Sequence, residues 1–382
     1  MLIGLNGQRI LIDKPAGPEV YTINFFKALA KTDQKNKYVV YFTSEPDKSF
    51  WDGLKQGNSN FSYKVVPKLL SWTQVGLALE LMKSPVDLFF TAVHTIPIIR
   101  KPSLKTVGMI HGLEYTHSAE YKNPLLRLSA HSPVKFVAKK SDAIIVPSQA
   151  TKDEILKRAW GVEENKITVV REGVNETFYK RSGEEIKNVR EKYNLKEYPY
   201  LIFVSTIQPR KNIPVMVGAF SQALKEKLIP AETKLVIAGK LGWLYEESLA
   251  APKKYGVEAS VLFVGRVNDA DLPPLLSGAK AFISCSLEEG FGLPLLEAMA
   301  CEVPTVVSNI PPFREVGAEF PIYVDPKNIE SIKSGIAQIF SQEGSQDVQG
   351  RAWSAKERAN NFSWENTARE SLKIFENVVE DR

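Results

Sequence analysis

The chain alternates short apolar runs with longer amphipathic segments, and it does so in two separate series. Short runs rich in Val, Ile and Phe are typical of buried parallel strands, and their alternation with helices predicts open α/β sheets. At 382 residues the chain is also longer than a single hydrophobic core usually supports. The sequence therefore predicts an α/β fold of two doubly wound domains.

The positions of the apolar runs set the expected elements. In the first series we expect strands at 1–5, 38–42, 88–90, 106–110 and 143–146, and helices at 19–31 and 152–159. In the second we expect strands at 200–205, 234–238, 261–264, 281–284, 305–308 and 322–324, and helices at 213–226, 272–277, 295–300 and 329–341. The charged stretch 179–199 has no strand pattern, so we expect the linker between the domains there.

Residues 286–300 carry the strongest indication of chemistry, and they read Ser-Leu-Glu-Glu-Gly-Phe-Gly-Leu-Pro-Leu-Leu-Glu-Ala-Met-Ala. An apolar run precedes them, and Pro294 suits a first helical turn, so we expect a strand, a glycine turn and a helix. Free N–H groups and the helix dipole favour an anion at such a turn. Glu289 and Glu297 border it. The segment therefore predicts a site for a phosphorylated, hydroxyl-rich ligand.

These residues resemble the Glu-x7-Glu motif of the retaining glycosyltransferases of family 4, which have the GT-B fold. The resemblance implies two Rossmann-like domains facing a cleft, at 1–180 and 197–363, with a last helix, 364–382, that crosses back to the N-terminal domain. It implies that Glu289 contacts the donor sugar and that Glu297 binds the nucleotide ribose. The turn between them, implied to bind the donor, consists of Gly290, Phe291, Gly292 and Leu293.

Four other segments resemble parts of the same site. Residues 205–212, Ser-Thr-Ile-Gln-Pro-Arg-Lys-Asn, follow the first strand of the second series, where open parallel sheets bind ligands. Arg and Lys suit a diphosphate. By resemblance, Lys211 and Arg210 neutralise the leaving diphosphate, Ser205 lines the donor site, and His111 lies beside the reacting sugar. The resemblance also implies a main-chain contact of Val267 with the base, and an acceptor and phosphate loop at Gly17.

Asp269 and Asp271 form an Asp-x-Asp pair, a pattern that can bind a divalent ion. Both precede a predicted helix, where acidic side chains cap the free N–H groups, and we favour capping. The basic residues would neutralise the phosphates. We therefore expect no metal and no other cofactor.

The resemblance implies transfer of a hexose from a nucleotide-diphosphate sugar to a glycan or lipid-linked acceptor, with retention of configuration. Residues 239–245 look like a segment of mannosyltransferases that use GDP-mannose, which favours mannose, while UDP-glucose and UDP-N-acetylglucosamine stay open. A GT-B nucleotide-sugar epimerase and an inactive sugar-nucleotide-binding partner protein also stay open. A dinucleotide oxidoreductase is disfavoured, because no Gly-x-Gly-x-x-Gly follows the first strand.

Positive charge is concentrated in the first half of the chain. Residues 1–180 hold 25 Lys and Arg against 17 Asp and Glu, a net of +8, whereas the whole chain has +5. Residues 132–140 are the best local candidate for contact with acidic lipid, although a solvated helix face also explains them. No apolar run reaches the length of a membrane span, the start lacks a signal-peptide pattern, and Cys285 and Cys301 suit free buried thiols. We expect a cytoplasmic protein with no nucleic-acid partner, and peripheral contact with the inner membrane face stays open.

Overall fold

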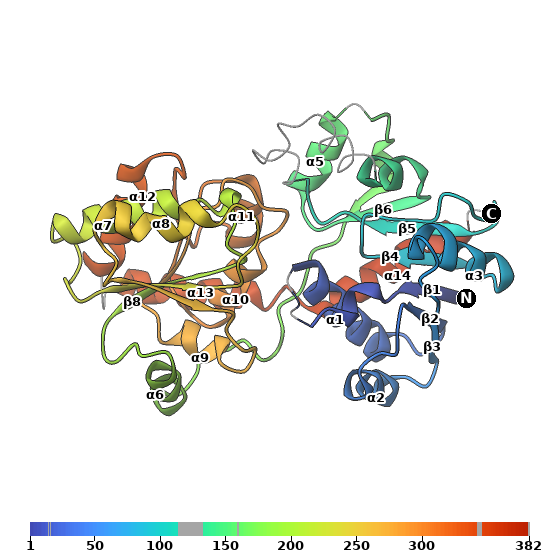
Figure 1. The fold of residues 1–382 in the computed structure, drawn as a ribbon, viewed down its shortest axis with the longest axis horizontal. Coiled ribbons are helices and arrows are strands. Elements are labelled where there is room, and N and C mark those ends of the chain that lie inside the picture. Colours follow the sequence, from blue (N-terminus) through green and yellow to red (C-terminus); the bar gives the residue numbers. More distant parts are fainter. Residues whose placement is uncertain (14, 16, 114–132, 159, 342–345, 381–382) are drawn as a thin grey trace. The chain divides into compact units, whose positions relative to one another are not determined.

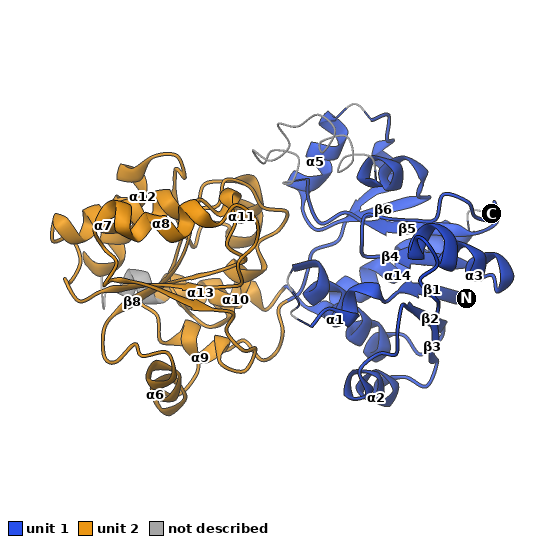
Figure 2. Cartoon of the chain, in the orientation of Figure 1, with its two compact units in different colours: residues 1–173, 362–382 blue, residues 174–361 orange. Residues whose placement is uncertain are grey.

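The structure, a computed structural model, describes all residues except 14, 16, 114–132, 159, 342–345 and 381–382 (Figure 1). The chain forms two compact units (Figure 2). The first comprises Met1–Gly173 and Phe362–Arg382, and the second Val174–Asn361. Each is a Rossmann-like unit built on one parallel sheet, so the predicted fold class is confirmed.

The first unit has a seven-stranded parallel sheet of order β3-β2-β1-β4-β5-β6-β7. Its strands are β1 Leu2–Asn6, β2 Lys37–Phe42, β3 Phe61–Val65, β4 Leu88–Thr91, β5 Lys105–Met109, β6 Ala143–Val146 and β7 Ile167–Val169. Our strand predictions missed β3 and β7, the two edge strands. Three consecutive residues of β3 are exposed and β7 spans only three residues, so neither presents an apolar run.

Helices of the first unit cover this sheet, and the last one comes from the far end of the chain. They are η1 Gln8–Leu11, α1 Gly17–Thr32, α2 Lys48–Gly57, the π-helix η2 Trp72–Leu77, α3 Ala78–Lys83, α5 Gln149–Lys157, η5 Glu164–Lys166 and α14 Trp364–Glu380. Residues 133–140 are also helical. Helix α14 packs along α1, and the Phe375 ring lies 5.3 Å from that of Phe90 in β4. The predicted return of the last helix to the N-terminal domain is therefore confirmed.

The second unit repeats the design with a six-stranded parallel sheet of order β10-β9-β8-β11-β12-β13. The strands are β8 Tyr200–Val204, β9 Lys234–Ala238, β10 Val261–Gly265, β11 Ala281–Ser284, β12 Thr305–Ser308 and β13 Ile322–Val324. The helices are α6 Gly183–Lys192, η6 Pro209–Lys211, α7 Ile213–Lys225, α8 Glu246–Tyr255, α9 Leu272–Ser277, α10 Leu293–Ala300, α11 Pro311–Gly317, α12 Ile329–Ser341 and α13 Gln346–Ala359. Helix α7 packs with α8 and α12, and α10 packs with α9 and α13. Every predicted strand of this series is present.

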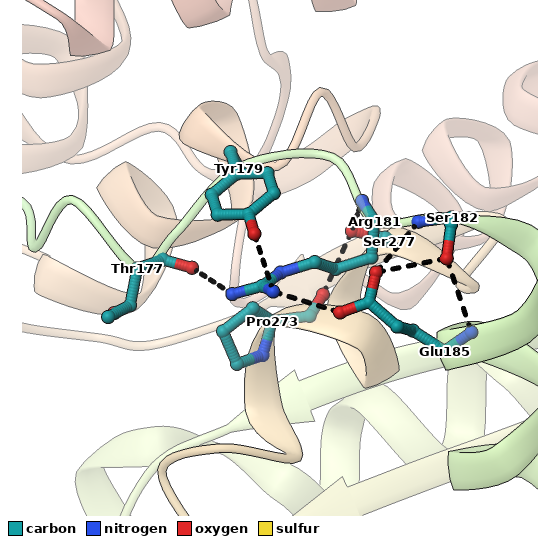
Figure 3. Close-up of polar contacts among 7 residues, drawn as sticks. All are labelled: Thr177, Tyr179, Arg181, Ser182, Glu185, Pro273 and Ser277. Atoms are coloured by element: carbon teal, nitrogen blue, oxygen red, sulfur yellow. Dashed lines mark hydrogen bonds and ion pairs between the residues drawn. The ribbon is translucent and has the colours of Figure 1, made fainter.

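The stretch 179–199, where we expected the linker, contains a capped helix and lies within the second unit. Arg181 donates to the Tyr179 hydroxyl at 2.8 Å, to the Glu185 carboxylate at 2.9 Å and to the Thr177 carbonyl at 2.7 Å (Figure 3). Its own backbone N–H donates to Ser277 Oγ in α9 at 3.1 Å. The compact units instead divide at Gly173, earlier in the chain than we expected.

Two simpler expectations can be checked in the same structure. Cys285 and Cys301 are buried and free, as predicted. Among the described helices, none combines the length and the apolar character needed to cross a membrane.

Replacing Phe375 by Ala should destabilise the first unit. The side chain is fully buried, so its removal leaves a cavity, and the free energy of unfolding should fall by about 3–5 kcal/mol in a urea titration. Asn377→Ala, on an exposed position of the same helix, is the matched control. Equal unfolding curves for the two variants would contradict the packing of α14 on this sheet.

Candidate functional site

The second sheet has a natural ligand position between β8 and β11. These two strands are neighbours, and the order of strands reverses there. In open parallel sheets, ligands bind at the carboxyl ends of the strands at such a point. The segments that leave β8 and β11 there, residues 205–212 and 285–292, are the two that the sequence singled out.

Backbone and side-chain contacts hold these two loops together. The backbone N–H of Leu287 donates to the carbonyl of Arg210 at 2.8 Å, and the guanidinium of Arg210 donates to the carbonyl of Glu288 at 2.8 Å. Asn212 ends η6 in the left-handed conformation, with φ 57°, which Asn tolerates better than most residues. Its side chain donates to the Pro326 carbonyl at 2.6 Å. The basic residues are therefore held on a fixed turn.

Glu289 lies between the two cations. Its carboxylate is 2.5 Å from Lys211 Nζ and 2.8 Å from Arg210 Nη1, and the exposed fractions of the three side chains are 12%, 6% and 16%. Burial alone would raise the pKa of Glu289, but the charges and hydrogen bonds of Lys211 and Arg210 lower it to about 2. The carboxylate is thus ionised at neutral pH. The cluster thus brings one anion and two cations together.

The glycine turn after Glu289 leads into α10 as predicted. Gly292 is the N-cap, with φ 115°, and a Cβ there would lie 2.8 Å from the Phe313 ring, so only glycine fits without strain. Leu293 and Pro294 open the helix. Gly290, Phe291 and Gly292 are buried at this end. The positive end of the α10 dipole therefore begins three residues beyond the cationic cluster and adds to its attraction for an anion.

Glu297 lies on α10, and its protonation state at neutral pH is the opposite of that of Glu289. Burial raises its pKa to about 8, and the charge of Asp269, in the loop after β10, contributes. The carboxyl group is therefore mostly protonated at pH 7. The surroundings of the two glutamates therefore give them different charges at neutral pH. The cations keep Glu289 ionised, whereas desolvation and the nearby Asp269 keep Glu297 mostly protonated.

The loops that follow β8, β9 and β10 meet at the same edge of the sheet. The N–H of Gly239 donates to the Gly265 carbonyl at 2.7 Å, and that of Ser205 donates to the Ala238 carbonyl at 3.0 Å. A Cβ on Gly239 would lie 1.7 Å from the Ser205 carbonyl oxygen, which explains the glycine. Val267, the residue expected to contact the base, is buried in the loop after β10.

His111 and Gly17 belong to the first unit. His111 follows β5, with Nε2 3.0 Å from the Ala92 carbonyl and Nδ1 3.4 Å from Glu172, so both ring nitrogens face oxygen acceptors. The Tyr21 ring packs on it at 4.9 Å. Gly17 is not in a loop but begins α1, and no atom of the described residues lies within 4 Å of where its Cβ would be.

Sequence reasoning missed several residues around these positions. Glu172, buried beside His111, was not singled out. Glu19 is also buried and lies 2.8 Å from Arg9. His94 lies 6.4 Å from His111, ring centre to ring centre. Because these contacts join separate segments of the chain, no local sequence pattern predicts them.

Our capping prediction for the Asp pair was wrong in detail. Asp271 stands at the N-cap of α9 but makes no capping bond. It instead accepts from Lys192 Nζ at 2.6 Å and from the Tyr193 hydroxyl at 2.9 Å. Asp269 lies 3.4 Å from Arg266. Across the described part of the chain, no group of three or more His, Cys, Asp or Glu could hold a metal ion.

Replacing Glu297 by Gln should stabilise the second unit at high pH. Because its pKa is higher in the folded than in the unfolded chain, the wild type loses stability as pH rises from about 4.5 to about 8. That loss is about 3–5 kcal/mol at 1.36 kcal/mol per pKa unit, and the Gln variant escapes it. In urea titrations, the Gln variant should therefore have a higher free energy of unfolding than the wild type at pH 9 but not at pH 5. An equal difference at both pH values would contradict the raised pKa of Glu297.

Two family models match this chain, one in each unit. Residues 185–356 match the family model of the glycosyl transferases group 1, and residues 15–178 match that of Glycosyltransferase Family 4. The O-antigen chain mannosyltransferase B of Escherichia coli is 30% identical over 61% of this chain and 60% of its own length. The O-antigen chain mannosyltransferase RfbU of Salmonella typhimurium is 28% identical over 65% of this chain and 64% of its own length. The chain thus spans less than two thirds of these relatives.

Solved structures show the same fold. HepE of Anabaena, crystallised with UDP and glucose, superposes with a TM-score of 0.76 at 18% identity, over 99% of this chain and 100% of its own. The sucrose-phosphate synthase of Thermosynechococcus elongatus also gives 0.76 at 18% identity, over the full length of both chains. These likenesses show that the chain has the GT-B fold. The two family models, which together match most of both units, show that it belongs to the family 4 glycosyltransferases.

Proposed function

We propose that the protein transfers a hexose, with mannose favoured, from a nucleotide-diphosphate sugar to a glycan or lipid-linked acceptor, with retention of configuration. The observation that carries the proposal is the cluster of Glu289, Lys211 and Arg210 at the reversal point of the second sheet. Its two cations and the start of α10 suit a diphosphate. Two relatives named as mannosyltransferases support the choice of sugar.

The two cations of the cluster have one role in the proposed reaction, and Glu289 has another. The bond from the anomeric carbon to the diphosphate breaks, and Lys211 and Arg210 stabilise the charge that develops on the leaving oxygen. The acceptor oxygen bonds to the same face of that carbon, and its proton passes to the leaving phosphate. Glu289, ionised and held by the two cations, accepts from the sugar hydroxyls.

Glu297 and His111 complete the proposal. The Glu297 carboxyl would bind the ribose hydroxyls, and nucleotide binding there would favour its ionised form, which accepts more hydrogen bonds. His111, held by Ala92 and Glu172, would stabilise the charge that develops near the anomeric carbon of the bound sugar. The comparisons favour a transferase over the epimerase and the inactive partner protein.

A thermal-shift panel tests the proposal and selects the donor. The ligands are GDP-mannose, UDP-glucose, UDP-N-acetylglucosamine, GDP, UDP and NAD, each with and without a chelator. A ligand that binds only the folded chain stabilises the folded state and so raises the melting temperature of the protein. We expect the largest shift with GDP-mannose, unchanged by chelator. A shift with NAD alone would overturn the proposal, and a shift abolished by chelator would overturn its metal independence.

His111→Ala should separate binding from transfer. We expect unchanged donor affinity and a transfer rate lower by roughly 100-fold, the scale of one lost electrostatic contact in a transition state. Glu297→Ala is the matched opposite, because it should weaken nucleotide binding by at least tenfold. Donor affinity is read by titration and transfer by release of the nucleoside diphosphate in the presence of acceptor. If the His111→Ala variant transfers the sugar at the wild-type rate, His111 has no role in the mechanism.

A further inference from the structure

One buried acid of the first unit has a histidine as its partner. Glu172 follows β7 and is 5% exposed, and its carboxylate lies 3.4 Å from His111 Nδ1. Among the described residues, no lysine or arginine forms an ion pair with this carboxylate, and no other group donates a hydrogen bond to it. Burying a carboxylate is costly unless a charge or a donor compensates it. The ionised form of Glu172 therefore depends on His111.

The His111 ring is held at both nitrogens and against the edge of a second ring. Nε2 lies 3.0 Å from the Ala92 carbonyl oxygen, and Nδ1 faces the Glu172 carboxylate. The Tyr21 ring packs on it with an angle of 78° between the ring planes. A neutral imidazole has one N–H and can donate to only one of the two oxygens, whereas an imidazolium donates to both. The form that satisfies both acceptors therefore carries a proton on each nitrogen.

Helix α14 fixes the backbone from which Glu172 reaches this ring. The Thr367 hydroxyl, in α14, donates to the carbonyl of Arg171 at 2.7 Å. On the other side of Glu172, a Cβ on Gly173 would lie 2.2 Å from the backbone nitrogen of Trp364, so the chain passes directly against the start of the helix. The carboxylate is therefore anchored on both sides by backbone contacts.

Two other ionisable side chains lie beside His111, and both are neutral at pH 7. Burial, with the charges of His111 and Arg9, lowers the pKa of His94 to about 3. Burial also raises the pKa of Tyr21, and the charge of Glu172 contributes. Neither side chain carries a positive charge at neutral pH. Neither therefore competes with His111 for the negative charge of Glu172.

We propose that Glu172 is a positioning residue, which fixes the His111 ring and keeps a proton on Nδ1, so that the ring is positively charged during transfer. This inference rests on the proposed function, because it takes His111 as part of the transfer site. A positive ring stabilises the negative charge that develops on the oxygens around the anomeric carbon. It also cannot act as a base, which agrees with passage of the acceptor proton to the leaving phosphate. Glu172 acts only through His111.

Nitrogen-15 NMR of the full chain, labelled at histidine, tests this pairing without any nucleotide sugar. The chain has four histidines, and the signals missing from His111→Ala identify those of His111. At pH 7 we expect a proton on both nitrogens in the wild type and on only one in Glu172→Gln. Because a nearby opposite charge favours the charged form, the ring of this variant should lose its second proton at a pH lower by about one unit.

Two further variants are the controls. Glu172→Asp keeps the negative charge and should keep a proton on both nitrogens of His111. Asp142→Asn removes a carboxylate that accepts from the backbone N–H of Thr106, at the other end of β5, and should leave the ring as in the wild type. Equal melting temperatures would show that all variants fold. The pairing is overturned if Glu172→Gln keeps both protons, or if Asp142→Asn changes the ring as much.

Transfer assays separate this inference from the proposed function. At pH 7, Glu172→Gln should transfer the sugar about tenfold more slowly with unchanged donor affinity, because fewer rings are protonated. Its rate should also fall at a lower pH than that of the wild type. If the two proteins transfer equally at every pH, the positioning role is wrong and the proposed function stands. If the wild type transfers from no sugar nucleotide, the proposed function and the positioning role are both wrong, while NMR still decides the pairing.

Discussion

The contact between the Glu289 carboxylate and the side chains of Lys211 and Arg210 is the interaction on which the candidate site depends. It joins the loops that leave β8 and β11, and so it sets the shape of the sheet edge where a ligand is expected. The carboxylate bonds the buried Lys211 and the half-buried Arg210, so each of these cations has an opposite charge beside it. The same contact therefore stabilises the two loops, and it fixes the positions of the two cations that we propose bind a diphosphate.

The two glutamates of the motif show how the fold separates the roles of like residues. Glu289 stays ionised because cations surround it, whereas burial and Asp269 keep Glu297 mostly protonated at neutral pH. A carboxyl group whose pKa is raised by folding lowers the stability of the protein as pH rises. In the first unit, His111 is held in a similar way by contacts from distant segments, Ala92 and Glu172.

Much of the fold follows from the sequence, because a buried parallel strand must be apolar along its length. The predicted strands of both series satisfy that condition, whereas β3 is exposed along one edge and has no such pattern. Helix α6 was missed although Ser182 and Glu185 form a capping box, since its polar surface suggested a linker. The sequence singled out Glu289, Lys211 and Arg210 in two separate segments, and the structure brings these three side chains into contact. The sequence could not predict the contact of Glu172 with His111 or the partners of Asp271, because these contacts join residues far apart in the chain.

The most direct test of the site compares the affinity of a nucleoside diphosphate with that of its monophosphate, for the wild type and for Lys211→Met. If the cluster binds the diphosphate, the wild type should prefer the diphosphate by at least tenfold, about 1.4 kcal/mol, and the variant should lose most of that preference. Titration calorimetry with GDP and GMP, and with UDP and UMP, gives both ratios. An equal preference in the wild type and the variant would contradict the role of Lys211 and with it the proposed donor site.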